Sequence, residues 1–524
     1  MKKFGLVLLL LLSACTPKVE PVTRKTVDEL EILLKDANAD SFTQSVSTAY
    51  SLFPIAFADS NGDNKGDLQG IISKLDYLND NDPSTTTDLG IDAVWMNPIY
   101  PSDTYHKYDI NDYKAIDKDF GTMDDFKMLL SEAHKRGIKI ILDMVFNHTS
   151  DTNPWFMKGI SGTSPYDEYY MIKTKIKMSD YPANTGWYGK NSRMYFAGFW
   201  SEMPDLNAES ELLRTELKGV LDFWMDLGVD GFRFDAVTQV YAMNEYPTGT
   251  PILALSKQFW MEMKQYIETK NKDVYTVGEA WVGANLASSY APGFDSLFNF
   301  DLALGIVTVV KNGSSSNLMD NYLNGQNVFE SKTDNYVDAI FLTNHDQNRI
   351  MSEVSGDTDK AKLAANILFT LPGIPFVYYG EELGMAGMKP DEHIRETFVW
   401  NKTINPPMAD WVYNQYNKST PTYEQQVTDP DSMFQVYRTL IELRKNSEVL
   451  RFGDIQKINS SYQFLAYSRS YNGKTWIILH NVSGLSQVFT LSSEGTIIYT
   501  HKEVSVNLTE ATLGPRSTLI FEVN

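Results

Sequence analysis

Two carboxylates in this chain are spaced as a pair that could cleave a glycosidic bond. Asp235 ends the run Gly-Val-Asp-Gly-Phe-Arg-Phe-Asp, and Glu279 ends Tyr-Thr-Val-Gly-Glu 44 residues later. Such cleavage needs one carboxyl group to protonate the leaving oxygen and another to attack the sugar or to activate water. In a retaining enzyme the two lie roughly 5 Å apart, which neighbouring strands spaced about 4.8 Å can supply. The spacing therefore predicts a catalytic pair if both residues end adjacent strands.

Arg233 and Asp346 extend this pair. Arg233 lies two residues before Asp235, so the two-residue period of a strand points both side chains to one face. A guanidinium at that position would keep the carboxylate ionised. Asp346, after a later strand, could hold sugar hydroxyls or raise the proton affinity of Glu279. Taken singly, each carboxylate is typical of a solvated strand end, so the prediction depends on their sharing one rim.

Eight short β-rich runs from about Ala49 onward provide the elements for such a rim. The runs are Tyr50–Ala58, Ala93–Met96, Ile138–Phe146, Gly231–Phe234, Val274–Val277, Phe294–Phe300, Ala339–Leu342 and Pro375–Tyr379. Helical patterns lie between several of them, as in Asp124–Arg136 and Glu211–Leu227, where apolar residues recur three and four positions apart. Strands that alternate with helices predict an α/β fold with a parallel sheet, and eight units predict a closed (β/α)₈ TIM barrel.

Polar residues follow these runs directly. They are Asn147-His148, Asp235, Glu279, His345-Asp346 and Glu381-Glu382. In a barrel, positions that follow the strands share the C-terminal face, where active sites are built. Residues distant in the sequence are therefore expected to converge there.

Two segments depart from the alternating pattern and suggest additional domains. Residues 148–204 contain no strand–helix unit and are rich in Gly, Tyr and Trp, which predicts a subdomain inserted after the third strand. Residues 450–524 carry alternating apolar runs without helices, which predicts a C-terminal antiparallel β-sandwich domain. The barrel is then expected to comprise residues 44–147 and 205–449.

The N-terminus has the pattern of an export signal. Lys2 and Lys3 precede the aliphatic run Leu6–Leu12, which is too short to span a bilayer but suits a signal-peptide core. Leu12-Ser-Ala-Cys15 resembles the lipobox of bacterial lipoproteins, which implies that the Cys15 thiol is diacylated and that Cys15 becomes the new N-terminus after cleavage. Residues 1–15 are therefore assigned as a lipoprotein signal peptide with its lipobox cysteine, and the alternative is an ordinary secretory signal. Residues 16–43 are expected to form a tether with a short helix at Val27–Lys35. The predicted location is the bacterial cell envelope, lipid-anchored outside the cytoplasm, or the extracellular medium.

Composition constrains the partners. The 524 residues carry 46 Lys and Arg against 67 Asp and Glu, a net charge of −21, and such acidity argues against nucleic acid as a partner. Aromatic residues make up 13% of the chain, which fits either sugar stacking or a large core. Cys15 is the only cysteine, so intramolecular disulfides are impossible.

A polar loop follows the first β-rich run and has the pattern of a calcium site. Its candidate ligands are Asp59, Asn61, Asp63, Lys65 and Asp67. Oxygen side chains at alternate positions around glycines can wrap a hard cation. A simple polar turn is the alternative interpretation, because Asn-Gly pairs favour turns.

Four motifs together make the chain resemble the α-amylase family, glycoside hydrolase family 13, from Tyr50 to the C-terminus. They are Asp143-Met-Val-Phe-Asn147-His148, Gly231-Phe-Arg233-Phe-Asp235-Ala236, Gly278-Glu279-Ala-Trp281 and Thr343-Asn344-His345-Asp346. The resemblance implies Asp235 as nucleophile, Glu279 as acid/base and Asp346 as transition-state stabiliser. It also implies a substrate-binding set, with Tyr108 stacking under the reacting glucose. That set is His106, Tyr108, Asp109, Asp143, His148, Arg233, His345 and Arg349.

The resemblance also bears on calcium. Family members similar to oligo-1,6-glucosidases bind calcium in the loop that corresponds to residues 59–67. Many α-amylases hold a second calcium between barrel and insert, using a histidine four residues after the nucleophile. Here that position is Gln239, and the usual preceding lysine is Thr238. A second calcium site is therefore doubtful, although Asn147 retains one family ligand.

Two further features bear on which member of the family this is. Ala236 follows the nucleophile, where relatives that cleave α-1,6 bonds typically have valine, and this favours α-1,4 cleavage. Met203-Pro-Asp205-Leu-Asn207 resembles the family's fifth region in a form intermediate between oligo-1,6-glucosidases and neopullulanases. The expected activity is retaining hydrolysis of α-1,4-glucosidic bonds in starch and maltodextrins through a covalent glycosyl-enzyme. The alternatives are an α-glucosidase, neopullulanase or maltogenic amylase acting on short maltooligosaccharides or cyclodextrins, and a non-catalytic sugar-binding relative.

Overall fold

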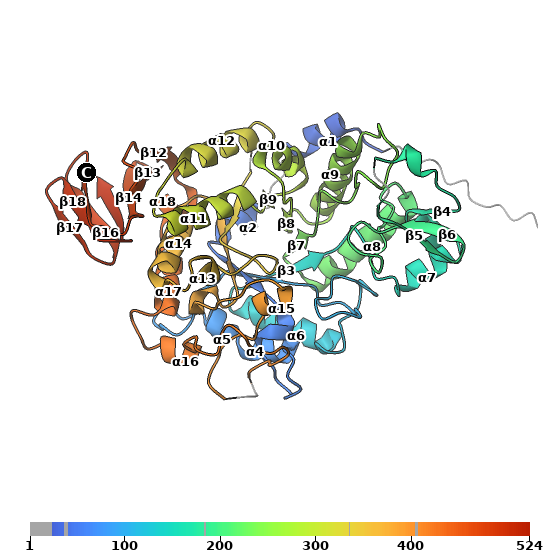
Figure 1. Cartoon of the computed structure of the whole chain (residues 1–524), viewed down its shortest axis with the longest axis horizontal. Helices are drawn as coiled ribbons and strands as arrows, with labels where there is room; N and C mark the ends of the chain where they lie inside the picture. The colour runs from blue at the N-terminus through green and yellow to red at the C-terminus, as the bar shows by residue number, and fades with distance from the viewer. Residues whose placement is uncertain (1–23, 36–39, 183–184, 335, 404–406, 524) are drawn as a thin grey trace, which may run out of the picture.

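A barrel of eight parallel strands forms the centre of the protein (Figure 1). The computed structural model describes residues 24–35, 40–182, 185–334, 336–403 and 407–523. The strands are β1 (Ala49–Leu52), β2 (Ala93–Met96), β3 (Lys139–Met144), β7 (Gly231–Phe234), β8 (Tyr275–Gly278), β9 (Ser296–Leu297), β10 (Ala339–Phe341) and β11 (Ile374–Tyr378). They are ordered β10-β11-β1-β2-β3-β7-β8-β9, and a parallel bridge between Phe298 and Ala339 joins the two ends. The predicted α/β fold with a (β/α)₈ barrel is therefore confirmed.

The barrel strands are short and almost entirely buried, because parallel strands are covered on both faces. Two of the predicted runs are longer than the strands they contain. The first strand stops at Leu52, and Pro54, which suits the first turn of a helix, begins α3 (Pro54–Phe57). After β9, the side chain of Asn299 accepts a hydrogen bond from the Leu302 amide and caps the next helix.

Helices surround the barrel and connect its strands (Figure 1). They are α4 (Leu68–Ser73), α5 (Leu75–Leu78), α6 (Met123–Lys135), α8 (Glu211–Leu227), α9 (Ile252–Lys270), α10 (Ala284–Ala287), α11 (Phe300–Asn312), α12 (Leu318–Glu330), α13 (Ile350–Glu353), α14 (Thr358–Thr370), α15 (Asp391–Ile394), α16 (Tyr423–Gln426), α17 (Met433–Lys445) and α18 (Glu448–Phe452). Helix α8 illustrates the sequence features that start, end and bury these helices. Ser210 caps its N-terminus, Gly228 ends it at φ 96°, and Leu217 and Trp224 lie on its buried face.

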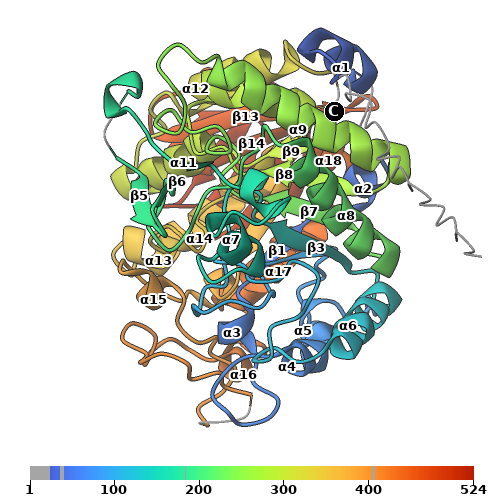
Figure 2. The same ribbon diagram turned by 90° about the vertical axis from the view of Figure 1, so that its right-hand side faces the viewer.

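The segment between β3 and β7 folds as an insertion over the barrel rim. It contains α7 (Pro154–Ile160) and a small antiparallel sheet of β4 (Ile172–Lys173), β6 (Arg193–Phe196) and β5 (Trp187–Lys190). A bridge pairs His148 with Asp205, so the two ends of the insertion lie side by side. Figure 2 shows this segment toward the viewer.

Antiparallel strands form the C-terminal domain, at the opposite end of the molecule from the insertion (Figure 1). One sheet contains β12 (Asp454–Lys457), β13 (Phe464–Tyr471), β14 (Lys474–Asn481), β19 (Thr518–Val523) and β16 (Gly495–His501), and the other contains β15 (Gln487–Thr490), β18 (Glu510–Leu513) and β17 (Val504–Asn507). Leu479 and Phe521 of the first sheet share a core with Ala511 and Leu513 of the second. The domain is thus the predicted β-sandwich.

Two short helices precede the barrel, α1 (Val27–Leu34) and α2 (Asp40–Ser45). Helix α1 lies along α9 (Figures 1 and 2), where Leu30 and Leu34 pack against Met261. Thr26 and Glu29 form a capping box at its N-terminus. The predicted lipidation site, Cys15, lies outside the described residues. Among the helices that the structure describes, none has the length and hydropathy needed to cross a membrane.

Candidate active site

Asp235 and Glu279 follow paired residues of two adjacent barrel strands. Phe234 of β7 is in register with Gly278 of β8, so the next residue of each strand lies at the same height on the C-terminal rim. Both carboxylates are largely buried, with 8% of each residue exposed. The parallel register therefore brings together two residues that are far apart in the sequence.

Arg233 connects these carboxylates through a single guanidinium group. Its Nη1 lies 2.6 Å from Asp235 Oδ1, and its Nη2 lies 2.9 Å from Glu279 Oε2. The same Nη1 donates to both oxygens of Asp143, at 2.9 and 3.0 Å. Arg233 has no exposed surface, and its guanidinium lies 4.9 Å from the centre of the Trp95 ring. One buried positive charge is thus shared by three carboxylates.

Burial and this shared charge set different proton affinities for the pair. Burial raises the pKa of Asp235 to about 6, because the lowering effect of Arg233 offsets only part of the desolvation. Burial raises the pKa of Glu279 to about 7, with the charge of Asp235 adding to the increase. Arg233 therefore lowers the pKa of Asp235, as predicted, but burial raises that pKa by more. Near neutral pH, Asp235 is the more readily ionised of the two.

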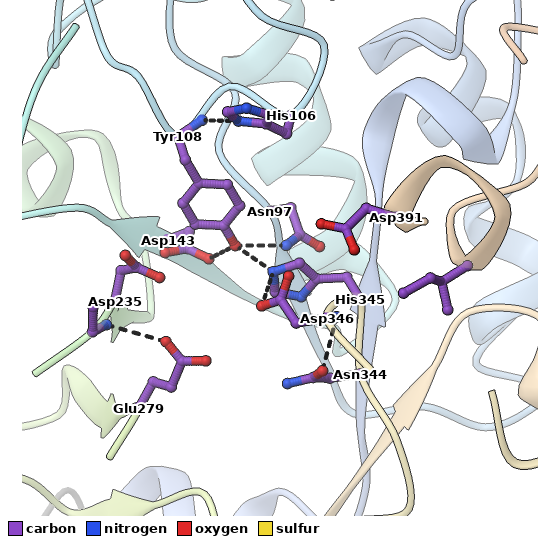
Figure 3. Close-up of polar contacts among 12 residues, drawn as sticks. Asn97, His106, Tyr108, Asp143, Asp235, Glu279, Asn344, His345, Asp346 and Asp391 are labelled. Carbon is purple, nitrogen blue, oxygen red and sulfur yellow. Dashed lines mark hydrogen bonds and ion pairs between the residues drawn. The ribbon is translucent and has the colours of Figure 1, made fainter. Parts of the chain in front are cut away.

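Asp346 faces this pair across the cleft (Figure 3). Arg395 Nη2 donates to its Oδ1 at 2.8 Å, and His345 Nε2 lies 3.1 Å from its Oδ2. Burial alone would raise the pKa of Asp346, but His345 and Arg395 outweigh it and hold that pKa well below its usual range. Arg395 Nε also donates to the backbone oxygen of His345 at 3.0 Å. Asp346 is therefore held ionised and in a fixed orientation.

Tyr108 forms part of the cleft wall within a dense hydrogen-bond network (Figure 3). Its hydroxyl donates to Asp143 Oδ2 at 3.0 Å, accepts from Asn97 Nδ2 at 2.9 Å and lies 2.9 Å from His345 Nε2. The Tyr108 and His345 rings are stacked with centroids 5.6 Å apart. His106 accepts from the Tyr108 amide at 3.2 Å. These contacts fix the ring as a rigid surface.

These side chains line a cleft of about 560 Å³. Its lining residues are His106, Tyr108, His148, Phe199, Met203, Asp235, Ala236, Thr238, Gln239, Glu279, Trp281, Val282, Asp346, Lys389, Asp391 and Arg395. Phe199 is 54% exposed and Trp281 is 53% exposed, and the Trp281 ring stacks on Phe300 at 4.7 Å. The cleft lining thus combines charged side chains with two exposed aromatic rings.

Sequence reasoning missed several of these lining residues. Arg395, Asp391 and Lys389 follow the last barrel strand by more than ten residues and belong to no recognised motif. Phe199 comes from the inserted segment, where the sequence has no periodic pattern. Trp281 could have been found, because it lies two residues after Glu279 on the same rim.

Other predicted site residues lie elsewhere. Asp109 accepts hydrogen bonds from the hydroxyls of Ser102 and Thr104 and stabilises its own loop. Arg349 is buried, stacks on two tyrosine rings and donates from Nη1 to the Tyr379 backbone oxygen at 2.6 Å. Neither residue lines the cleft. The polar groups of both side chains make hydrogen bonds within the protein.

Glu381 and Glu382, also expected at the rim, are buried beneath it. Glu382 accepts from the hydroxyls of Tyr50 at 2.7 Å and of Tyr77 at 2.5 Å. Glu381 accepts from the Tyr437 hydroxyl at 2.8 Å, and burial raises its pKa to about 8. This acidic pair belongs to the packing between the barrel and its helices.

The loop of residues 59–67 keeps its carboxylates close to the backbone. Asp59 Oδ1 accepts from the amides of Asn61 and Gly62, at 2.9 and 2.7 Å. Asp67 Oδ2 accepts from the Ser60 amide at 3.0 Å, and Lys65 pairs with Asp119 at 2.7 Å. Carboxylate and amide oxygens at alternate positions fit the donor chemistry of a hard cation. Within the described ranges, however, no three histidine, cysteine or carboxylate side chains form a group that could hold a metal ion.

Comparisons with known proteins agree with this geometry. The family model described as alpha amylase, catalytic domain, matches residues 51–453. Alpha-amylase 3 of Dictyoglomus thermophilum is 37% identical over 90% of this chain and 92% of its own length, and an oligo-1,6-glucosidase of Parageobacillus thermoglucosidasius is 30% identical over 88% and 94%. The crystal structure of an alpha-amylase from H. orenii superposes with a TM-score of 0.85 at 36% identity, covering 92% of this chain and all of that one. The chain therefore belongs to the alpha-amylase family, glycoside hydrolase family 13, and is a glycosidase.

Proposed function

We propose that the protein is an α-amylase, which hydrolyses α-1,4-glucosidic bonds in starch and maltodextrins with retention of configuration. The observation that carries this proposal is the shared contact of Arg233 with Asp235 and Glu279. It keeps the two carboxylates together at the ends of adjacent strands, with pKa values of about 6 and about 7. A retaining hydrolase needs this combination of one ionised and one protonated group.

The first step follows from these protonation states. Asp235 attacks C1 of the glucose unit, and the bond from C1 to the glycosidic oxygen breaks as Glu279 gives its proton to that oxygen. The product is a glucosyl ester of Asp235 and a glucan with a free hydroxyl group. In the second step, Glu279 takes a proton from water, the water oxygen bonds to C1, and the ester bond to Asp235 breaks. Both residues return to their starting states.

Surrounding residues position the sugar during these steps. Asp346, held ionised by Arg395, accepts hydroxyl hydrogen bonds and stabilises positive charge at the sugar ring. Tyr108 offers a fixed ring face for stacking, and burial lowers the pKa of His148 to about 3, so its imidazole is neutral. Asp143 fixes Arg233 and Tyr108, and therefore acts through them.

Specificity for α-1,4 bonds rests on finer features. Ala236 adopts φ 44° directly after the nucleophile, a backbone conformation in which a β-branched residue is strained. This supports the inference that the site differs from relatives with valine at that position. Thr238 and Gln239 line the cleft near Glu279, where they would contact the leaving part of the substrate.

The activity can be tested by reducing-sugar release from soluble starch. We expect wild-type protein to release sugar and Asp235→Asn to be reduced by several orders of magnitude. Equal release by both would refute the mechanism, and no release by either would favour a non-catalytic sugar-binding protein. Chromatography of products from amylose, pullulan, cyclodextrins and short maltooligosaccharides distinguishes an α-amylase from an α-glucosidase, neopullulanase or maltogenic amylase.

We also propose that residues 59–67 bind calcium through Asp59, Asn61, Asp63, the Lys65 carbonyl and Asp67. The support is the alternation of oxygen donors and the near-complete burial of Asp59 and Asp67. A cation bound only to the folded state stabilises it. Excess chelator should therefore lower the melting temperature of wild type but not that of Asp63→Ala, and equal shifts in both would contradict the assignment.

The N-terminal motif supports a proposal about the cellular location of the protein. We infer that Cys15 carries a lipid that anchors the enzyme to a membrane of the bacterial cell envelope, outside the cytoplasm. Cys15→Ser should move the protein from the membrane fraction to the soluble exported fraction. A substituted protein that stays in the membrane fraction would contradict the anchor.

A further inference from the structure

A small pocket lies at the opposite end of the barrel from the active-site cleft. Residues that lead into or begin β1, β10 and β11 line it, together with parts of α2, α17 and α18, and its volume is about 200 Å³. Two of the lining residues are the arginines Arg444 and Arg451, and none is an aspartate or glutamate. The pocket is therefore lined by positive charge alone, in a protein whose net charge is −21.

Arg444, on α17, is only 1% exposed. Its Nη1 donates to the backbone oxygens of Phe369 and Leu371, at 2.9 and 2.8 Å, and its Nη2 donates to that of Gly373. Its Nε is buried and finds no acceptor among the residues that the structure describes. Neutral carbonyl groups thus surround a buried guanidinium, whereas a buried arginine is normally paired with a carboxylate.

Two further arginines add to this positive charge. Arg451, on α18, donates to the Gln44 backbone oxygen, which holds α18 beside α2 (Figures 1 and 2), and its buried Nε also lacks an acceptor in the described part of the chain. Arg469, on β13, has no exposed surface, and its recorded hydrogen bonds all go to backbone oxygens. Burial, and then the charges of Arg469 and Arg451, lower the pKa of Arg444 to about 9. The three guanidinium groups therefore repel one another.

The acidic residues that act on Arg451 do not neutralise this group. They are Asp92 and Glu448. Asp92 Oδ2 accepts from the amide and the hydroxyl of Ser47, at 2.8 and 2.6 Å, and its Oδ1 lies 2.8 Å from Lys445 Nζ. Glu448 is exposed, in the first turn of α18. Across the described ranges, no carboxylate forms an ion pair with any of the three arginines.

We propose that this pocket binds a small oxyanion, such as inorganic phosphate or sulfate, through Arg444 and Arg451. Guanidinium groups present several N–H donors in a fixed plane, which matches the oxygens of such an anion. The volume of about 200 Å³ is below the range typical of pockets for larger organic ligands, so it suits a small ion. A bound oxyanion would supply both the missing negative charge and the missing acceptor oxygens.

The position of the pocket gives the anion a structural role. Gln44 belongs to the segment before the barrel, Arg444 and Arg451 to the last helices of the barrel, and Arg469 to the C-terminal domain. An anion bound there would connect these parts and, because it binds only the folded protein, would raise the stability. The pocket shares no lining residue with the active-site cleft. Binding can therefore be measured without reference to the proposed activity.

Thermal unfolding of the whole protein tests the proposal. Sodium phosphate is titrated to millimolar concentrations at constant pH, with sodium chloride keeping the ionic strength constant, and sodium sulfate is titrated in parallel. We expect the melting temperature of wild type to rise with either oxyanion and the rise to be largely lost in Arg451→Gln. Arg516→Gln, which removes an arginine paired with Asp357 away from the pocket, is the matched control and should respond as wild type does.

Calorimetric titration with phosphate measures the binding directly. We expect at least tenfold weaker binding in Arg451→Gln, and an intermediate Kd in Arg451→Lys, which keeps the charge with fewer donors and serves alone if Arg451→Gln does not fold. A wild-type protein that binds neither oxyanion would overturn the proposal. An equal response in wild type and both Arg451 variants, or an equal response to chloride, would also overturn it and leave the arginines with a purely structural role at the backbone oxygens.

Discussion

The backbone amide of Ala236 donates a hydrogen bond to Glu279 Oε2 at 3.1 Å, so the residue that follows one carboxylate orients the other. Figure 3 draws this contact as the dashed line that reaches the labelled Glu279 carboxylate. Ala236 itself is at φ 44°, so the backbone leaves the extended conformation directly after the strand. Arg233 Nη2 contacts the same oxygen, so two donors fix Glu279. The acid/base is therefore positioned by the backbone that carries the proposed nucleophile.

The first prediction concerns the pH dependence of the reaction. Activity needs Asp235 ionised, with a pKa of about 6, and Glu279 protonated, with a pKa of about 7. We expect kcat/KM to rise through the lower value, fall through the higher one and peak between them, as apparent values of the coupled pair. Initial rates on a soluble maltooligosaccharide at constant ionic strength measure this profile. A rate that stays flat through both values would contradict the assignment.

The second prediction separates the acid from the nucleophile. Glu279→Gln cannot donate a proton, so cleavage of starch should fall by about two to four orders of magnitude. On a substrate whose leaving group needs no proton, such as a dinitrophenyl glucoside, the rate of the first step should fall much less. Comparing the two substrates in wild type and variant measures the difference. Equal losses on both would count against Glu279 as the acid.

The third prediction concerns Arg395 as a positioning residue for Asp346. A lost charged hydrogen bond of about 1.5–3 kcal/mol corresponds to a tenfold to hundredfold lower kcat for Arg395→Ala. Its removal also raises the pKa of Asp346, but His345 still lowers that pKa, so Asp235 continues to set the acidic limb of the profile and the loss should appear in kcat. Arg395→Lys keeps the positive charge but lacks the planar guanidinium with its several N–H donors, so it should restore part of the activity.

Arg516→Ala, which removes an ion pair with Asp357 outside the cleft, is the control for this series. Its kcat and pH profile should match wild type. If Arg395→Ala changed only the melting temperature and left kcat unchanged, Arg395 would have a structural role alone.

The fourth prediction concerns stability through Glu381. Its pKa is about 8 in the folded protein and about 4.3 in an unfolded chain, so folding favours the protonated form. This contribution to the free energy of unfolding is complete at pH values below the pKa of the unfolded chain. It is lost as the pH rises through the pKa of the folded protein. Glu381→Gln stays neutral and can still accept from Tyr437. Its melting temperature should match wild type at acidic pH and exceed it increasingly up to about pH 8; a difference independent of pH would refute the interpretation.

The sequence allowed the barrel and its central carboxylates to be predicted because both depend on local pattern. Each of β7 and β8 ends in a short motif, and the parallel register then determines that Asp235 and Glu279 meet. Strand lengths were less predictable: the run that starts at Tyr50 continues as a helix because Pro54 cannot extend a strand pairing.

Residues that act across long connections could not be predicted in this way. Arg395 reaches Asp346 from α15 and its flanking loop, 49 positions later, and no spacing rule covers such a distance. Arg349 illustrates the opposite case. The family resemblance implied a substrate contact for it, but its long side chain turns back to the backbone of Tyr379. The sequence shows which residue type follows a strand, whereas packing determines where its side chain points.

The shared guanidinium has a consequence for the middle of the catalytic cycle. In the resting enzyme, the negative charge of Asp235 raises the pKa of Glu279. In the proposed mechanism Asp235 then forms an ester with the sugar and that charge is gone, while Arg233 still lies 2.9 Å from Glu279. The pKa of Glu279 must then fall, so the group that gave up its proton has less affinity for recovering one from bulk solvent. Bond formation at one carboxylate thus switches the other from acid to base without any movement of the backbone.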